Sequence, residues 1–232
     1  MAPTNTFTIT AGPGTDIWRK PPTTDVFNAP IALPPPNEGG GGPRPLRTTG
    51  PLTSFLSARL SLNFTPQQQY DQGGILLSFH RRHTTTTTTT PSSTTTASPP
   101  QKWIKSGIEL YNGHPRLSTV SCDNWADWSV ADLHQHPTSS QQEEGSSSAS
   151  ETGWTTMLIE KDKDVNGTGV WVYRVTDEGE KVPLREICWV FGDRPEEWDV
   201  EVHAMAARPE KAAQGGLVVE FGGLEVEWAE EA

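Results

Sequence analysis

The sequence of 232 residues predicts an all-β fold in which two antiparallel sheets pack face to face. Many short segments alternate apolar and polar residues and are rich in Val, Ile, Thr, Phe and Trp. No segment keeps the 3.6-residue apolar period of an amphipathic helix, and Gly, Pro and polar residues separate the segments. Ten such segments at this spacing are typical of a β-sandwich.

The expected strands are residues 7–11, 53–64, 74–80, 102–112, 116–122, 155–162, 169–175, 184–191, 200–207 and 216–228. A chain of this length often forms one all-β domain, so we expect a single domain over residues 1–232. Low-complexity inserts at about 33–45, 83–101 and 134–152 contain few residues that a core can bury, and we expect them to lie outside both sheets as loops.

Charge is uneven along the chain, which carries a net charge of −11. Residues 1–100 hold seven Lys and Arg against four Asp and Glu, and the remainder holds 11 against 25. An acidic chain argues against nucleic acid and against an anionic membrane surface as partners.

The N-terminus lacks a basic and apolar leader, and no apolar run reaches 18 residues, so we expect a cytoplasmic protein. Cys122 and Cys188 are then expected to be buried small hydrophobes.

The segment KWIKSGIELY, residues 102–111, has two faces of different composition. At the two-residue period of a strand, Ile104, Ser106, Ile108 and Leu110 point to one side, and Trp103, Lys105, Gly107, Glu109 and Tyr111 point to the other. The first set is a core face. The second set combines aromatic rings, two opposite charges and a glycine, which is an unusual composition for a face that only meets solvent.

Five segments together resemble a known family. They are AGPGTDIWRK (11–20), YDQGGILLSF (70–79), KWIKSGIELYNGHPRLSTV (102–120), DNWADWS (123–129) and AMAARPE (204–210). Their residues and their order along the chain are similar to those of segments in a concanavalin A-like family of uncharacterised proteins that includes the fungal regulation-of-enolase protein. The chain departs from the family pattern at Pro21, Gly74 and Ala126, where the family usually has Thr, Ala and Ser.

The resemblance implies a jelly-roll sandwich of two curved antiparallel sheets, with no established catalytic activity. In such a fold the second face of 102–111 is either a solvated back or the concave groove. Aromatic rings beside charged groups suit a sugar or another small polar ligand, because C–H faces stack on rings and hydroxyls take directed hydrogen bonds. The expected ligand-binding residues are Trp18, Gln72, Trp103, Lys105, Glu109, Asp127 and Trp128.

Gly107 adds a steric expectation to this hypothesis. Glycine weakens a strand interior, so its place between Lys105 and Glu109 indicates that something approaches the strand closely. If that is a ligand, Gly107→Val abolishes binding at little cost in stability. The structural alternative is a ladder of cross-strand pairs: Lys105 and Glu109 stand about 13 Å apart along a strand and each needs a partner on a neighbouring strand.

No catalytic residue, metal ligand or cofactor is assigned from the sequence. The carboxyl pairs Glu225/Glu227 and Asp199/Glu201 have the spacing that a glycoside hydrolase needs, but alternating apolar neighbours place them on the solvent side of strands. The histidines lack nearby ligands that would complete a zinc site.

We therefore expect a non-catalytic regulatory protein of carbohydrate metabolism that binds a carbohydrate, a sugar phosphate or another small polar metabolite in its concave face. The alternatives are an interaction module for a metabolic enzyme and a cryptic glycoside hydrolase.

Overall fold

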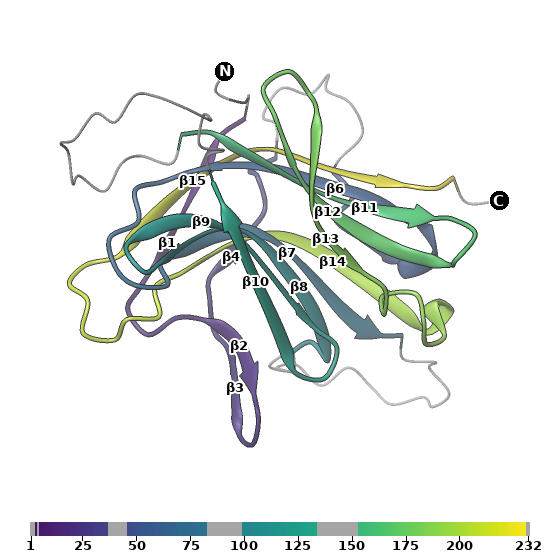
Figure 1. Cartoon of the computed structure of the whole chain (residues 1–232), viewed down its shortest axis with the longest axis horizontal. Coiled ribbons are helices and arrows are strands. Elements are labelled where there is room, and N and C mark those ends of the chain that lie inside the picture. The colour runs from purple at the N-terminus through teal and green to yellow at the C-terminus, as the bar shows by residue number, and fades with distance from the viewer. Residues whose placement is uncertain (1–2, 4, 37–45, 83–98, 134–152, 231–232) are drawn as a thin grey trace, which may run out of the picture.

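The protein is an all-β sandwich of two antiparallel sheets, as the sequence predicts (Figure 1). The computed structural model describes residues 3, 5–36, 46–82, 99–133 and 153–230. The six-stranded sheet has the order β1 (Phe7–Ala11), β15 (Leu217–Trp228), β6 (Phe55–Asn63), β11 (Thr155–Lys163), β12 (Thr168–Val175) and β13 (Lys181–Ile187). The seven-stranded sheet has the order β10 (Ala126–Asp132), β9 (His114–Cys122), β8 (Lys102–Tyr111), β7 (Gln72–Arg81), β14 (Trp198–Ala207) and β4 (Ile31–Ala32), with β5 (Thr49–Pro51) also pairing β14.

Each of the ten segments expected to be strands overlaps a strand of the structure. The largest boundary difference is at 184–191, where β13 begins at Lys181 and ends at Ile187. After β13 the chain leaves the sheet through a turn in which the Gly192 amide donates to the Trp189 carbonyl. Within the described residues, helix is confined to two 3₁₀ turns, η1 (Leu52–Ser54) and η2 (Pro195–Glu197).

Five strands were not predicted. Residues 126–132 were not among the expected strands and form β10, the edge strand beside β9. The hairpin of β2 (Ile17–Lys20) and β3 (Thr24–Phe27) carries charges and two prolines, and β4 and β5 have only two and three residues. These segments are too short or too polar to show a two-residue period.

The main core fills the space between the two sheets. Alternate residues of the long strands point inward, among them Leu60 and Leu62 of β6, Leu77 of β7 and Val219 of β15. Ile104 and Ile108 of β8 belong to this core, so the first face of 102–111 is a core face as expected. Burial of side chains of this size contributes about 1.5–3 kcal/mol each.

A second apolar cluster lies on the outer face of the seven-stranded sheet, away from the six-stranded sheet. Leu76, Trp103, Val120 and Met205 are its buried members on the sheet. The β2–β3 hairpin packs on this face through Ile17 and lies on the opposite side of β7 and β8 from β6 and β11 (Figure 1). The middle of the sheet is therefore buried on both faces.

A buried ion pair joins three connections at one end of the sheet. Arg208 Nε and Nη2 donate to the two carboxylate oxygens of Asp71, at 2.9 and 2.8 Å, and both side chains are at most 1% exposed. Asp71 also accepts from the amides of Gln67 and Gln68, and the Arg208 carbonyl accepts from the Thr15 amide. The pair thus fixes the chain before β2, the turn before β7 and the end of β14.

Cys122 is buried as expected, whereas the expectation for Cys188 was wrong: it follows the end of β13 and is exposed. Of the predicted inserts, residues 37–45, 83–98 and 134–152 lie outside the described residues. Among the residues that are described, no helix has the length and apolar character that crossing a membrane requires.

We predict that Asp71→Asn lowers the free energy of unfolding by about 3–5 kcal/mol, because it leaves the Arg208 charge buried without its counter-ion. Asp199→Asn is the control: Asp199 pairs with Arg82 at 2.8 Å, but both side chains are exposed, and the loss should stay within about 0.5 kcal/mol. Urea unfolding followed by tryptophan fluorescence measures the free energy of unfolding of both variants. Equal losses in the two variants would contradict the structural role of the buried pair.

Candidate ligand-binding site

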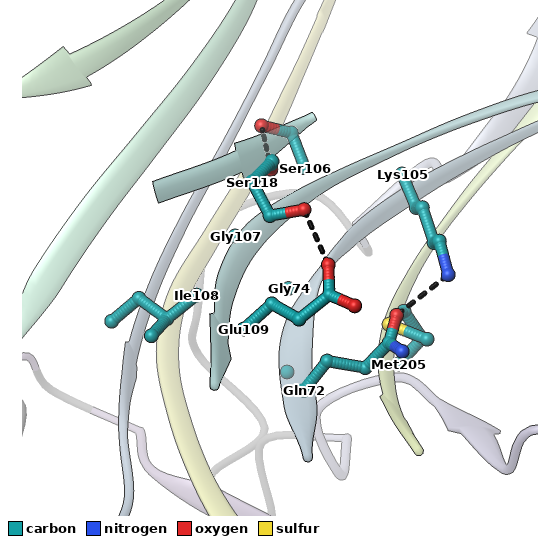
Figure 2. A pocket seen from close by; sticks show the side chains of 10 residues that line it. Gln72, Gly74, Lys105, Ser106, Gly107, Ile108, Glu109, Ser118 and Met205 are labelled. Carbon is teal, nitrogen blue, oxygen red and sulfur yellow. Dashed lines mark hydrogen bonds between the residues drawn. The ribbon is translucent and has the colours of Figure 1, made fainter. Parts of the chain in front are cut away.

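A small cavity opens on the outer face of the seven-stranded sheet, over β7, β8, β9 and β14 (Figure 2). Its volume is about 10 Å³, roughly the space that one water molecule needs. The residues whose side chains or backbone line it include Gln72, Gly74, Lys105, Gly107, Glu109, Ser118 and Met205. The face of β8 that the sequence singled out therefore contributes the cavity wall.

The cavity floor is a pair of glycines on neighbouring strands. Gly74 and Gly107 are register partners of β7 and β8. A Cβ atom at position 107 would lie 2.0 Å from the Gly73 carbonyl oxygen and 2.5 Å from the Gly74 Cα. What approaches Gly107 closely is therefore the backbone of β7, and the expectation that Gly107→Val costs little stability is wrong.

Lys105 is a buried cation held by polar neighbours. It is 5% exposed, and its Nζ donates to Gln72 Oε1 at 2.6 Å and lies 3.4 Å from Asp16 Oδ1. The same Nζ stands 5.9 Å from the centre of the Trp103 ring. Because Gln72 is the register partner of Glu109, the Lys105 side chain extends along the sheet toward Glu109.

Glu109 is a buried carboxyl group with one firmly held oxygen. It is 6% exposed, and its Oε2 accepts from the Ser118 hydroxyl at 2.6 Å. Ser118 Oγ in turn accepts from the Trp128 indole N–H at 2.9 Å. Burial raises the pKa of Glu109, and the nearby Lys105 charge and the Ser118 hydrogen bond lower it less than burial raises it.

Four aromatic rings form a wall beside the cavity. Trp128 meets the ring of Tyr111 edge to face at 4.9 Å, that of Tyr70 at 6.3 Å and that of Trp18 at 6.5 Å. Tyr70 and Tyr111 stack at 6.2 Å. Tyr70 is 40% exposed and the other three rings are half-buried, so the wall presents aromatic surface to solvent.

The structure brings together six of the seven expected site residues. Gln72, Lys105 and Glu109 line the cavity, Trp18 and Trp128 belong to the aromatic wall, and Trp103 is buried beneath the hairpin at 1% exposure. Asp127 lies apart. It points to the opposite side of β10 from Trp128, and its carboxylate pairs with Arg185 of β13.

Five residues of the site were not among the expected ligand-binding residues, and one of them is Tyr111 of the wall, which the sequence placed on the second face of 102–111. Asp16 contacts Lys105 from the chain before β2, Tyr70 belongs to the wall, and Ser118 and Met205 line the cavity. Asp16 and Tyr70 stand inside the AGPGTDIWRK and YDQGG segments, so the motifs themselves were the available signal. Ser118 and Met205 needed the pairing register of β8 with β9 and of β7 with β14.

The carboxyl pairs considered for hydrolysis lie elsewhere. Glu225 and Glu227 are exposed on the six-stranded sheet, where Ser57 donates to Glu227. Asp199 pairs with Arg82, and Glu201 lies 3.7 Å from His80. Within the part of the chain that the structure describes, no three or more His, Cys, Asp or Glu residues cluster as metal ligands would.

Fold and site together define a two-sheet β-sandwich that carries a polar cavity under an aromatic wall. The chain belongs to the family described as "Protein of unknown function (DUF1349)", whose profile matches residues 2–228. An uncharacterised protein of Emericella nidulans is 33% identical over 221 residues, which cover 95% of this chain and 86% of that protein.

One solved structure agrees with the sandwich fold, and a second is more distant. A functionally unknown protein from Saccharomyces cerevisiae superposes with a TM-score of 0.57 at 17% identity, over 100% of this chain and 92% of that one. An alginate lyase from Klebsiella pneumoniae gives a TM-score of 0.42 at 8% identity, over 78% of this chain and 62% of that one. The first similarity shows the fold, and the second is too distant to carry an argument about function.

We predict that Gly107→Ala lowers the free energy of unfolding by about 1–3 kcal/mol, because its Cβ meets the backbone of β7. Gly12→Ala is the matched control, since a Cβ at position 12 meets no atom within 4 Å and should change stability by at most about 0.5 kcal/mol. Urea midpoints of the two variants measure the difference. Identical midpoints would show that the two strands separate easily at this point.

We predict that Glu109→Gln is more stable than the wild type at pH 7 and loses this advantage as the pH falls toward 4. The raised pKa means that the folded state holds a proton that the unfolded state has released, so wild-type stability falls as the pH rises through this window. Glutamine keeps an acceptor for Ser118 and has no charge to bury.

Thermal unfolding between pH 4 and pH 8 measures the difference between Glu109→Gln and the wild type. Glu227→Gln is the control, because its carboxylate also accepts a serine hydroxyl but is exposed. A Glu109→Gln protein that is less stable than the wild type at pH 7 would favour the cross-strand ladder as the whole role of Glu109.

Proposed function

We propose that the protein binds a small hydroxyl-rich ligand, of the sugar or sugar-phosphate type, on the outer face of the seven-stranded sheet, and that it does so without catalysing a reaction. The observation that carries this proposal is the direct link between the polar cavity and the aromatic wall. Glu109, Ser118 and Trp128 form one hydrogen-bonded chain from the cavity to the rings.

The two halves of the site suit the two kinds of surface on a sugar. Aromatic planes bury the C–H faces of a sugar ring, while buried charged groups give strong, directed hydrogen bonds to hydroxyls. Contacts between the rings also hold them in place. Trp128 contacts the other three rings of the wall, and its indole N–H donates to Ser118. A wall held in this way loses little side-chain entropy on binding.

The proposed physiological role is regulation of carbohydrate metabolism in the cytoplasm. It rests on the resemblance of the sequence motifs to the family that includes the regulation-of-enolase protein. Binding of a sugar-like metabolite would let such a protein report metabolite concentration to a partner enzyme, and a ligand stabilises the state that binds it by mass action.

The second candidate is an interaction module for a metabolic enzyme, and a different surface favours it. A hollow of about 180 Å³ on the outer face of the six-stranded sheet is lined by Glu160, Glu225 and Glu227 together with Arg59 and Lys181. Charged groups of this kind steer association and are screened by salt. Enolase binding that weakens with salt and with Glu225→Gln, but survives Glu109→Gln, would favour this candidate.

We predict that at least one neutral monosaccharide or sugar phosphate binds and raises the melting temperature, and that Tyr70→Ala weakens its binding about tenfold by removing one ring of the wall. Trp125→Ala is the control: Trp125 is 42% exposed, close to the 40% of Tyr70, but it makes none of the wall contacts. Calorimetric titration measures both. If no sugar or sugar phosphate binds at millimolar concentration, the proposal fails.

A further inference from the structure

The hydrogen bonds around the cavity leave one acceptor and one donor available. Ser118 donates to Glu109 Oε2 and Trp128 also favours the charged carboxylate, while within the described residues no hydrogen bond of ordinary geometry ends on Glu109 Oε1. Lys105 Nζ has three N–H groups, of which two face Gln72 Oε1 and Asp16 Oδ1. Figure 2 shows the Glu109 carboxylate between Ser118 on one side and the Lys105–Gln72 pair on the other.

The neighbouring groups cannot turn to satisfy these positions. Ser118 Oγ accepts from Trp128 while it donates to Glu109, which fixes its hydroxyl proton. Gln72 accepts from Lys105 through Oε1 and donates through Nε2 to the Tyr70 carbonyl at 3.2 Å, which fixes the orientation of its amide. Because Glu109 and Lys105 both line the cavity, we expect the free acceptor and the free donor to face its open space.

We infer that this cavity is a socket for a single hydroxyl group of a neutral sugar or polyol, an inference that rests on the proposed function. A hydroxyl donates one hydrogen bond and accepts others, so it can donate to Glu109 Oε1 while it accepts from Lys105 Nζ. A phosphate or carboxylate oxygen only accepts and an ammonium group only donates, so each leaves one buried group unsatisfied. The cavity volume of about 10 Å³ fits one such group and no sugar ring.

Charge supports the choice of a neutral ligand. Asp16 and Glu109 are two carboxylates around one cation, Lys105, whose ion pair is already made with Asp16. A phosphate placed in the socket would meet the Glu109 carboxylate at short range in a buried environment, where like charges repel strongly. A sugar phosphate can therefore bind only with its phosphate directed away from the socket.

The test is a titration calorimetry series with D-glucose, D-galactose, D-mannose and myo-inositol, followed by monodeoxy analogues of whichever compound binds. One deoxy analogue should bind at least about 100-fold more weakly than its parent, and the others should lose about threefold or less, because a site built to bond one hydroxyl rejects the analogue that lacks it. Glucose 6-phosphate and glucose 1-phosphate should bind no more tightly than glucose.

Glu109→Gln completes a cycle with these ligands. It should weaken binding of the parent sugar about tenfold or more and leave binding of the critical deoxy analogue unchanged, since that analogue makes no bond to position 109. Glu227→Gln is the charge-matched control and should leave every affinity unchanged.

The outcomes separate the two proposals. If a sugar binds and responds to Tyr70→Ala, but all deoxy analogues lose affinity equally or the phosphates bind more tightly, the socket is wrong and the proposed function stands. If no neutral sugar, polyol or sugar phosphate binds, both are wrong.

Discussion

The buried pair of Asp71 and Arg208 is the contact on which both the fold and the site depend. Arg208 directly follows β14 and Asp71 directly precedes β7, two neighbouring strands of the seven-stranded sheet. The same pair holds the chain at Thr15 through two hydrogen bonds, the Thr15 amide to the Arg208 carbonyl and the Arg208 amide to Thr15 Oγ1. A buried ion pair costs desolvation free energy that its attraction only partly offsets, so its value here lies in the geometry that it imposes.

That geometry sets the positions of the site residues. Asp16 follows Thr15, Tyr70 precedes Asp71, and Gln72 follows it, so three residues of the site are direct neighbours of the residues that the pair fixes. Asp16 and Gln72 then hold Lys105 in the cavity wall. The AGPGTDIWRK, YDQGG and AMAARPE segments thus have a common physical basis, since all three meet at this pair.

The long strands and the unusual face of β8 could be predicted from the sequence because both depend only on a two-residue period. The strand β10 was not predicted, and without it nothing sorts Asp127 and Trp128 onto opposite faces of a sheet. Once β10 pairs with β9, Trp128 stands over Ser118 and Asp127 is turned toward β13. The rule that a glycine within a strand marks a close approach was correct at Gly107, but it could not say that the neighbouring strand makes the approach.

The structure also refines the choice between a binding site and a structural ladder. Both interpretations require cross-strand partners for Lys105 and Glu109, and both residues have them. What separates the interpretations is how completely each buried group is satisfied. Lys105 Nζ donates to the amide oxygen of Gln72 and to the carboxylate of Asp16. Glu109 accepts from one hydroxyl, that of Ser118, on one of its two oxygens, and burial raises its pKa more than its favourable contacts lower it.

In a face whose only role is stability, an apolar residue at position 109 would avoid this cost, as Val120 and Leu76 do nearby. A buried carboxyl that lowers stability and lines a cavity is instead what the proposed binding site requires. Under that proposal, stability is given up at one position so that a ligand can supply a further hydrogen bond.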